Sequence, residues 1–185
     1  MSGKMLVFPE ETYKAPVRLT TSTQNLGAVT VCLRYLTDLT RGTTYFSLAT
    51  PSHFNGFLIY KYGSSNEISV FVRDTRSIFK GQDFQLSRWQ SVCSTWDAAS
   101  GLVQLWLDGK PSSMKFITNT NITGPMIIVL GQVQYETHGG GFVTEDSFMG
   151  MISDIHMWDH VLPPCHIEYY TNKQSFPVLF KKCFN

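Results

Sequence analysis

Short apolar runs separated by turn residues recur along most of the chain, and they constrain its fold more than any other feature. The runs are rich in β-branched and aromatic residues, which favour strands, and Gly, Pro, Asn or Asp follow many of them. Strands that are short and closely spaced in this way are typical of an all-β sandwich. The predicted strands are KMLVF, AVTVCLRYL, TTYFSLAT, FLIYK, EISVFVR, WQSVCSTW, LVQLWL, MIIVLG and MISDIHMW.

One hairpin is predicted in more detail. The connection between Trp96 and Leu102 is short enough for a hairpin loop, so Cys93 and Leu105 are expected on adjacent antiparallel strands. Asp108-Gly109 then supplies a tight turn after the second strand.

A helix is predicted only near the C-terminus, from Pro163 to Asn172. Its prolines suit a first helical turn, and Ile167 and Tyr170 lie three positions apart, on one helix face. The sequence therefore predicts an all-β sandwich with one short helix.

Size and charge limit the remaining possibilities. A chain of 185 residues that is 43% hydrophobic can bury a sizeable core as one domain, residues 1–185. The net charge is +1 and both signs are dispersed, so no basic stripe is available for phosphates of a nucleic acid. Nucleic acid is therefore excluded as an expected partner.

The cysteine count and one sequon bear on the cellular compartment. Four cysteines, an even number, and the sequon Asn121-Ile122-Thr123 fit an oxidising compartment. The first residues lack the apolar core of a secretory signal, and no stretch approaches the roughly 20 residues of a transmembrane span. We expect a mature secreted chain whose leader has been removed; the alternative is a cytosolic protein with buried thiols.

Catalytic motifs give little support for an enzyme. A glycan hydrolase needs two carboxylates facing one cleft, and a strand-borne Glu-x-Asp or Glu-x-Glu that would aim two acids to one face is absent. Neither a Gly-x-Ser-x-Gly elbow nor a His-Glu-x-x-His motif occurs. We predict a protein that is not an enzyme, with a jelly-roll glycan hydrolase as the less favoured alternative.

The segment Gly131–Ser147 is the most unusual loop. It contains three consecutive glycines together with Glu136, Glu145 and Asp146. Oxygen ligands spread over an irregular loop suit Ca²⁺, which takes about six to eight oxygens. Glycine-rich connectors without a ligand are also common, so the residues alone leave both interpretations open.

Several motifs carry a family resemblance. The segment SVCSTWDAASGLVQLWLDGKP, Ser91 to Pro111, resembles the pentraxin signature, and KMLVFP, TVCLRYLTDL, YFSLAT, IIVLGQ and HMWDHVLPP resemble pentraxin segments in the right order. The match covers roughly residues 4 to 172. Ser91 and Ala98 depart from the signature, which usually has His and Ser or Thr there.

The resemblance implies a lectin-like jelly roll of two antiparallel sheets with a helix on one face. It implies a single pentraxin domain over residues 1–185, with an atypical shortened tail from about residue 173, and a secreted protein that assembles into a cyclic ring. A pentamer is the family default, and the shortened tail makes a trimer the alternative.

A disulfide between Cys32 and Cys93 is also implied by the resemblance. Cys165 and Cys183 have no family counterparts, so they either pair with each other or serve intermolecular bonding.

The implied function is that of a short pentraxin: a secreted, innate-immune, acute-phase pattern-recognition protein. It would bind phosphocholine-like, other phosphate-bearing or carbohydrate ligands through calcium, with affinity multiplied by a ring of identical sites. The alternative is a pentraxin-fold scaffold that acts through protein contacts without calcium.

Mapping the family's calcium ligands onto this chain leaves a depleted set. The remaining oxygen ligands are Asn55, Gln134, Glu136 and Asp146, with Glu145 beside the last. Because ligand charge is a main determinant of calcium affinity, at most one weakly held ion is expected, or none. Without an ion, the Gly139–Gly141 segment is expected to be mobile.

The family's choline-binding aromatic residue falls on Tyr60, and its carboxylate falls near Ser77. Loss of that carboxylate predicts weaker choline binding. Asp108 matches an acid of the family's complement-binding groove, which makes complement a candidate partner, although Asp-Gly is also an ordinary turn pair. Asn121 is a candidate glycosylation site.

Overall fold

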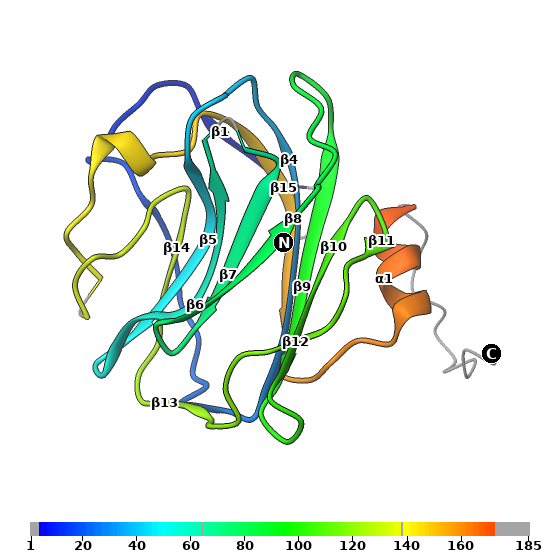
Figure 1. Cartoon of the computed structure of the whole chain (residues 1–185). Coiled ribbons are helices and arrows are strands. Elements are labelled where there is room, and N and C mark those ends of the chain that lie inside the picture. The colour runs from blue at the N-terminus through cyan, green and yellow to red at the C-terminus, as the bar shows by residue number, and fades with distance from the viewer. Residues whose placement is uncertain (1–3, 64, 138, 173–185) are drawn as a thin grey trace.

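The chain folds as two antiparallel β-sheets packed face to face, with one helix against the outside of one sheet (Figure 1). This computed structural model describes residues 4–63, 65–137 and 139–172. The predicted tail from residue 173, which includes Cys183, lies outside the described residues. The predicted jelly-roll class, with one short helix near the C-terminus, is confirmed.

The seven-stranded sheet has the order β1-β15-β4-β9-β10-β11, and β12 also pairs with β10. Its strands are β1 (Met5–Phe8), β15 (Gly150–Trp158), β4 (Ala28–Leu36), β9 (Gln90–Asp97), β10 (Leu102–Leu107), β11 (Lys110–Pro111) and β12 (Lys115–Phe116).

The six-stranded sheet has the order β2-β14-β5-β6-β7-β8. Its strands are β2 (Val17–Leu19), β14 (Ile127–Leu130), β5 (Thr43–Thr50), β6 (His53–Tyr62), β7 (Glu67–Val72) and β8 (Thr75–Lys80). A separate pair joins β3 (Asn25–Leu26) to β13 (Ile122–Thr123). The helices are the 3-10 turn η1 (Thr144–Asp146) and α1 (Pro164–Thr171).

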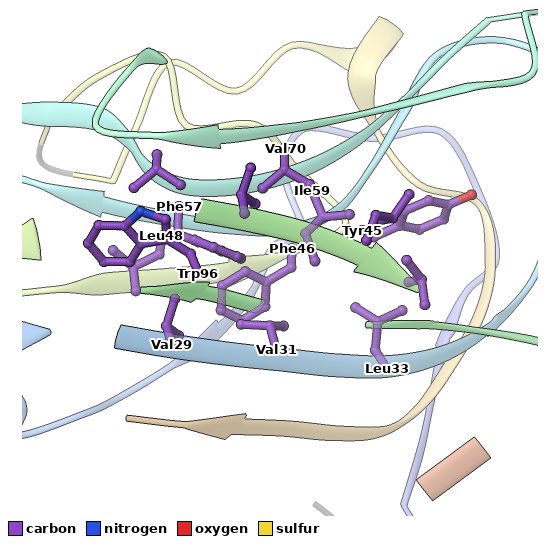
Figure 2. Packing of buried hydrophobic residues seen from close by; sticks show 14 of the residues in the cluster. Val29, Val31, Leu33, Tyr45, Phe46, Leu48, Phe57, Ile59, Val70 and Trp96 are labelled. Atoms are coloured by element: carbon purple, nitrogen blue, oxygen red, sulfur yellow. The ribbon is translucent and has the colours of Figure 1, made fainter. Parts of the chain in front are cut away.

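The core lies between the two sheets and follows from alternation along the strands. On β4, Val29, Val31 and Leu33 point inward and are fully buried. They face Phe46 and Phe57 of the other sheet (Figure 2). Burial of these apolar side chains is the main force that holds the two layers together.

A second apolar cluster lies on the outer face of the seven-stranded sheet, beneath α1. Cys32 and Cys93 are directly opposite each other on β4 and β9 and form a disulfide, as predicted. Trp106, Ile167 and Tyr170 pack around it. The helix therefore covers the disulfide and closes this face.

The predicted hairpin is also confirmed. Cys93 pairs with Trp106 and Ser94 with Leu105 across β9 and β10. Asp108 and Gly109 both have positive φ, 49° and 76°, the left-handed conformation that a two-residue hairpin turn requires.

Candidate functional site

The outer face of the six-stranded sheet carries a cluster of tyrosines. On β6, Phe57 and Ile59 point into the core, so Tyr60 and Tyr62 point outward. The rings of Tyr60 and Tyr62 meet edge to face with centroids 4.8 Å apart. Both side chains are partly exposed, so the sheet presents an aromatic wall to solvent.

The loop between β14 and β15 brings an acid to this wall. It lies beside β14 and β5 (Figure 1), and its base is closed by a hydrogen bond from the Phe148 amide to the Gly131 carbonyl at 2.8 Å. The Tyr60 hydroxyl donates to Asp146 Oδ1 at 2.7 Å, and the Tyr135 hydroxyl donates to Asp146 Oδ2. Both carboxylate oxygens of Asp146 are thus held by tyrosines, an arrangement we call the tyrosine clamp.

The clamp keeps its tyrosines protonated. Burial raises the pKa of Tyr60 well above its usual value, and the hydrogen bond to Asp146 raises it further. The same two causes, in the same order, raise the pKa of Tyr135. A deprotonated tyrosine would place a second negative charge against Asp146, so both hydroxyls remain donors at neutral pH.

A glycine gives the clamp its space. A Cβ on Gly42, which precedes β5, would collide with the Tyr60 hydroxyl. The position of that hydroxyl against Asp146 therefore depends on the missing side chain at residue 42.

Two arginines hold the rest of the loop. The Arg41 guanidinium donates to the carbonyls of Glu145 at 2.9 Å and Ser147 at 2.8 Å. Arg18 Nη2 donates to the Gly139 carbonyl at 2.7 Å. The Gly139–Gly141 segment is expected to be mobile on the premise that only a metal ion would fix it. That premise is wrong, because the Arg18 guanidinium binds the Gly139 carbonyl.

The four predicted calcium ligands fall into two groups. The amide oxygens Asn55 Oδ1 and Gln134 Oε1 are buried and accept no hydrogen bond from the described part of the chain. Gln134 itself is fixed through its amide nitrogen, which donates to Ser47 and to the Ile127 carbonyl. Buried carbonyl oxygens without donors suit a hard cation.

The carboxylates fit a cation less well. Asp146 is already held by two hydroxyls, and Glu136 is exposed on the loop, beside Gly140. Across residues 4–63, 65–137 and 139–172, no three His, Cys, Asp or Glu side chains gather closely enough to hold a metal ion. The donor set is thus mainly neutral oxygens, which bind calcium weakly.

The two residues predicted to bind ligand lie on opposite faces of the sheet. Ser77 pairs with Val70, a core residue, so it points inward with Phe79, whereas Tyr60 points outward. The neighbouring Arg76 takes the outer position instead. Its guanidinium lies over the Tyr62 ring, 4.1 Å from the centroid.

Asp108 ties its turn to the start of β9. Its Oδ1 accepts from the Ser91 amide at 2.7 Å and its Oδ2 from Gln90 Nε2 at 2.8 Å. It also lines a shallow groove of about 270 Å³ with Gln82 and Lys110. A complement contact at Asp108 stays a prediction.

Asn121 stays a candidate glycosylation site. It is half-buried, and its Nδ2 donates to Asn25 Oδ1 at 3.0 Å. A glycan on this nitrogen would leave one fewer N–H for that contact.

Comparison with known proteins identifies the family. The sequence model of the Pentaxin family matches residues 4–179. The chain belongs to the pentraxin family. The fold, the disulfide and the signature motifs all agree with this assignment.

Individual relatives are similar over most of this pentraxin. C-reactive protein of Xenopus laevis is 38% identical over 170 residues, which cover 90% of this chain and 70% of the relative. Serum amyloid P-component of Mus musculus is 36% identical over 166 residues, 89% of this chain and 73% of the relative. The heptameric SAP-like pentraxin from Limulus polyphemus has a TM-score of 0.81 and 23% identity, covering 90% of this chain and 81% of the other.

No helix in the described portion of this pentraxin is both long and apolar enough to span a bilayer.

Proposed function

We propose that this pentraxin is a secreted pattern-recognition protein that binds phosphate-bearing or carbohydrate ligands on the outer face of its six-stranded sheet. The proposal includes a ring of identical subunits and a binding face that depends little on calcium. It rests mainly on the tyrosine clamp, because Asp146 is one of the few acids available to a cation there and each of its oxygens already accepts a hydrogen bond from a tyrosine.

The clamp supports weak calcium dependence through competition. An ion that binds Asp146 competes with two tyrosine hydroxyls for the electron density of its carboxylate, and hydrogen bonds to a charged group contribute roughly 1.5–3 kcal/mol each. If calcium binds, the predicted ligands are Asn55, Gln134, Glu136 and Asp146, and the ion would supply a positive charge for an anionic ligand. The two guanidinium contacts from Arg18 and Arg41 keep the loop in place without it.

A ring of identical subunits would raise the overall affinity of sites that are individually weak. Identical sites on one side of a ring engage a repetitive surface together, which raises the overall affinity by orders of magnitude. The heptameric assembly of the Limulus relative supports a cyclic arrangement here. A pentamer is the family default, and a trimer is the alternative.

A binding role is favoured over hydrolysis by the way the acids are used. Asp146 is held by tyrosines, and Asp108 by Gln90 and the Ser91 amide at the start of β9. A hydrolase needs a proton donor and a second carboxylate across one cleft, and neither acid is placed for that work.

Calorimetric titration tests the proposal directly. Calcium is titrated first, then phosphocholine and phosphoethanolamine, each with and without calcium. We expect ligand heats that change little with calcium, and calcium binding no tighter than about 10⁻⁴ M. Tight binding of two ions would overturn the weak calcium dependence, and the absence of any ligand binding would favour the protein-contact scaffold. Light scattering with and without reductant measures ring size and any covalent cross-linking.

A further inference from the structure

Arg76 has an unused pair of donors on the open face. Its Nε donates to Ser69 Oγ at 2.9 Å, and the plane of its guanidinium covers the Tyr62 ring. Within the described residues, its two terminal nitrogens donate to nothing. These nitrogens form the end-on fork with which arginine binds a carboxylate or phosphate through two parallel hydrogen bonds.

The fork is also held in position before any ligand arrives. The hydrogen bond to Ser69, which is fully buried, fixes one edge of the guanidinium, and the contact with Tyr62 fixes its plane. A ligand therefore does not need to immobilise a free arginine side chain, which lowers the entropic cost of binding.

The acids that flank the tyrosines are already partnered. Glu67, which faces Tyr62 across the β6–β7 ladder, forms an ion pair with Lys80 at 3.4 Å. Asp146 is held in the tyrosine clamp. The charges of Glu67 and Lys80 offset each other. Asp146 keeps its negative charge at the Tyr60 end of the wall, because its partners there are neutral hydroxyls. Arg76 is the cation at the Tyr62 end.

We infer that this aromatic wall selects anionic ligands through Arg76, and that it does so without calcium. The ligand group is a carboxylate or a phosphate monoester, bound end-on by the two terminal nitrogens of Arg76. The ligand body lies along the wall formed by Tyr62 and Tyr60. A quaternary ammonium is disfavoured, because it would meet a guanidinium of like charge where a carboxylate would be needed. This inference rests on the proposed use of the face for ligand binding and defines the class of ligand.

Four small probes test the inference in metal-free buffer at low salt, where surface charge is least screened. They are methyl glucuronide, glucose 6-phosphate, methyl glucoside and choline, each titrated by calorimetry. We expect both acidic sugars to bind about 10-fold or more tightly than the neutral glucoside or choline. The ratio between the two acids tells whether a carboxylate or a phosphate is the better ligand.

Substitutions locate the effect. Arg76→Gln should weaken both acidic sugars by about 10-fold, and Arg76→Lys should give an intermediate loss, since it keeps the charge but not the fork. Arg88→Gln is the matched control, an exposed arginine that precedes β9 of the other sheet, and it should change nothing. Unchanged thermal unfolding of each variant shows that the fold is intact.

The outcomes separate this inference from the proposed function. Acidic sugars that bind Arg76→Gln as well as the wild type, or a preference for choline or the neutral sugar, would overturn the inference while leaving a ligand-binding face. No binding of any probe to the wild type would contradict both.

Discussion

The two outer faces of the sandwich are both built from alternating strands, but one face is covered and the other is open to solvent. The outer face of the seven-stranded sheet is closed: a disulfide lies on it, and Trp106 of β10 and Ile167 of α1 pack against that disulfide. The outer face of the six-stranded sheet is left open, with tyrosines and an arginine toward solvent. The covered face contributes stability, and the open face retains polar groups for binding. Alternation along the strands does not predict which outer face will be covered.

The means of attachment also differ between the faces. On the closed face, apolar contacts and a covalent bond hold the helix and strands, assisted by Arg34, whose Nη1 donates to the Thr171 carbonyl at 3.1 Å. On the open face, the loop is held by hydrogen bonds from charged or phenolic groups. The open face should therefore respond to pH and salt, and the closed face to redox conditions.

Removal of the disulfide tests the closed face and should have the largest effect. Cys32→Ala combined with Cys93→Ala releases a cross-link between residues 61 positions apart. In the chain-entropy account this costs about 4 kcal/mol of unfolding free energy. Denaturant unfolding of the variant and of the oxidised wild type measures it. A loss under about 1 kcal/mol would mean that packing beneath α1, not the cross-link, stabilises this face.

Loss of Arg41 tests the open face. Arg41→Gln removes the charged donor from the Glu145 and Ser147 carbonyls, which we expect to cost about 1–2 kcal/mol because the side chain is only partly shielded. Hydrogen exchange should speed up in residues 144–148 and change little in β4 and β9.

Arg88→Gln provides the matched control for that experiment. If the loop exchanges at the wild-type rate in Arg41→Gln, Arg41 does not order it, and the tyrosine clamp and Arg18 are sufficient.

Alkaline pH should give the smallest loss of unfolding free energy, and it tests the tyrosine clamp. The pKa values of Tyr60 and Tyr135 are raised in the folded state, mainly by burial. Above pH about 10, the ordinary tyrosine pKa, the unfolded chain releases these protons while the folded chain keeps them. The unfolded state then binds fewer protons, so stability falls as pH rises.

Replacing both clamp tyrosines isolates their share of this pH dependence. In Tyr60→Phe with Tyr135→Phe, the slope of unfolding free energy against pH above 10 should become shallower. It should not vanish, because burial also raises the pKa values of Tyr45 and Tyr170. An unchanged slope would indicate that the clamp tyrosines titrate normally.

Local sequence pattern was sufficient for nine of the strands, β1, β4–β7, β9, β10, β14 and β15, and for the hairpin of β9 and β10. Alternation predicts which residues of β4 and β6 face inward, and Asp108-Gly109 marks the turn. The strands β2, β3, β11, β12 and β13 were not predicted, because two or three residues are too few to show alternation. The strand β8 was not predicted because the outward positions of TRSIFK are charged or only half-buried. The disulfide came from the family resemblance and not from spacing.

The candidate site was harder to predict because long-range contacts and strand register decide it. Tyr60 and Asp146 are 86 positions apart and meet only because of the path of the loop. An assignment near Ser77 differs by one residue from Arg76, and one residue along a strand exchanges the core for solvent. The alternation of Ser77 and Phe79 in TRSIFK was the signal that could have assigned Arg76 to the outer face.

The space left by Gly42 ties the residue allowed at position 42 to the residue at position 60. Because any Cβ at residue 42 would push the Tyr60 hydroxyl away from Asp146, a larger residue there is compatible only with a smaller or displaced side chain at residue 60. Among descendants of this gene, glycine at 42 and tyrosine at 60 should therefore be inherited or lost together. A lineage that abandons the clamp would be free to fill position 42.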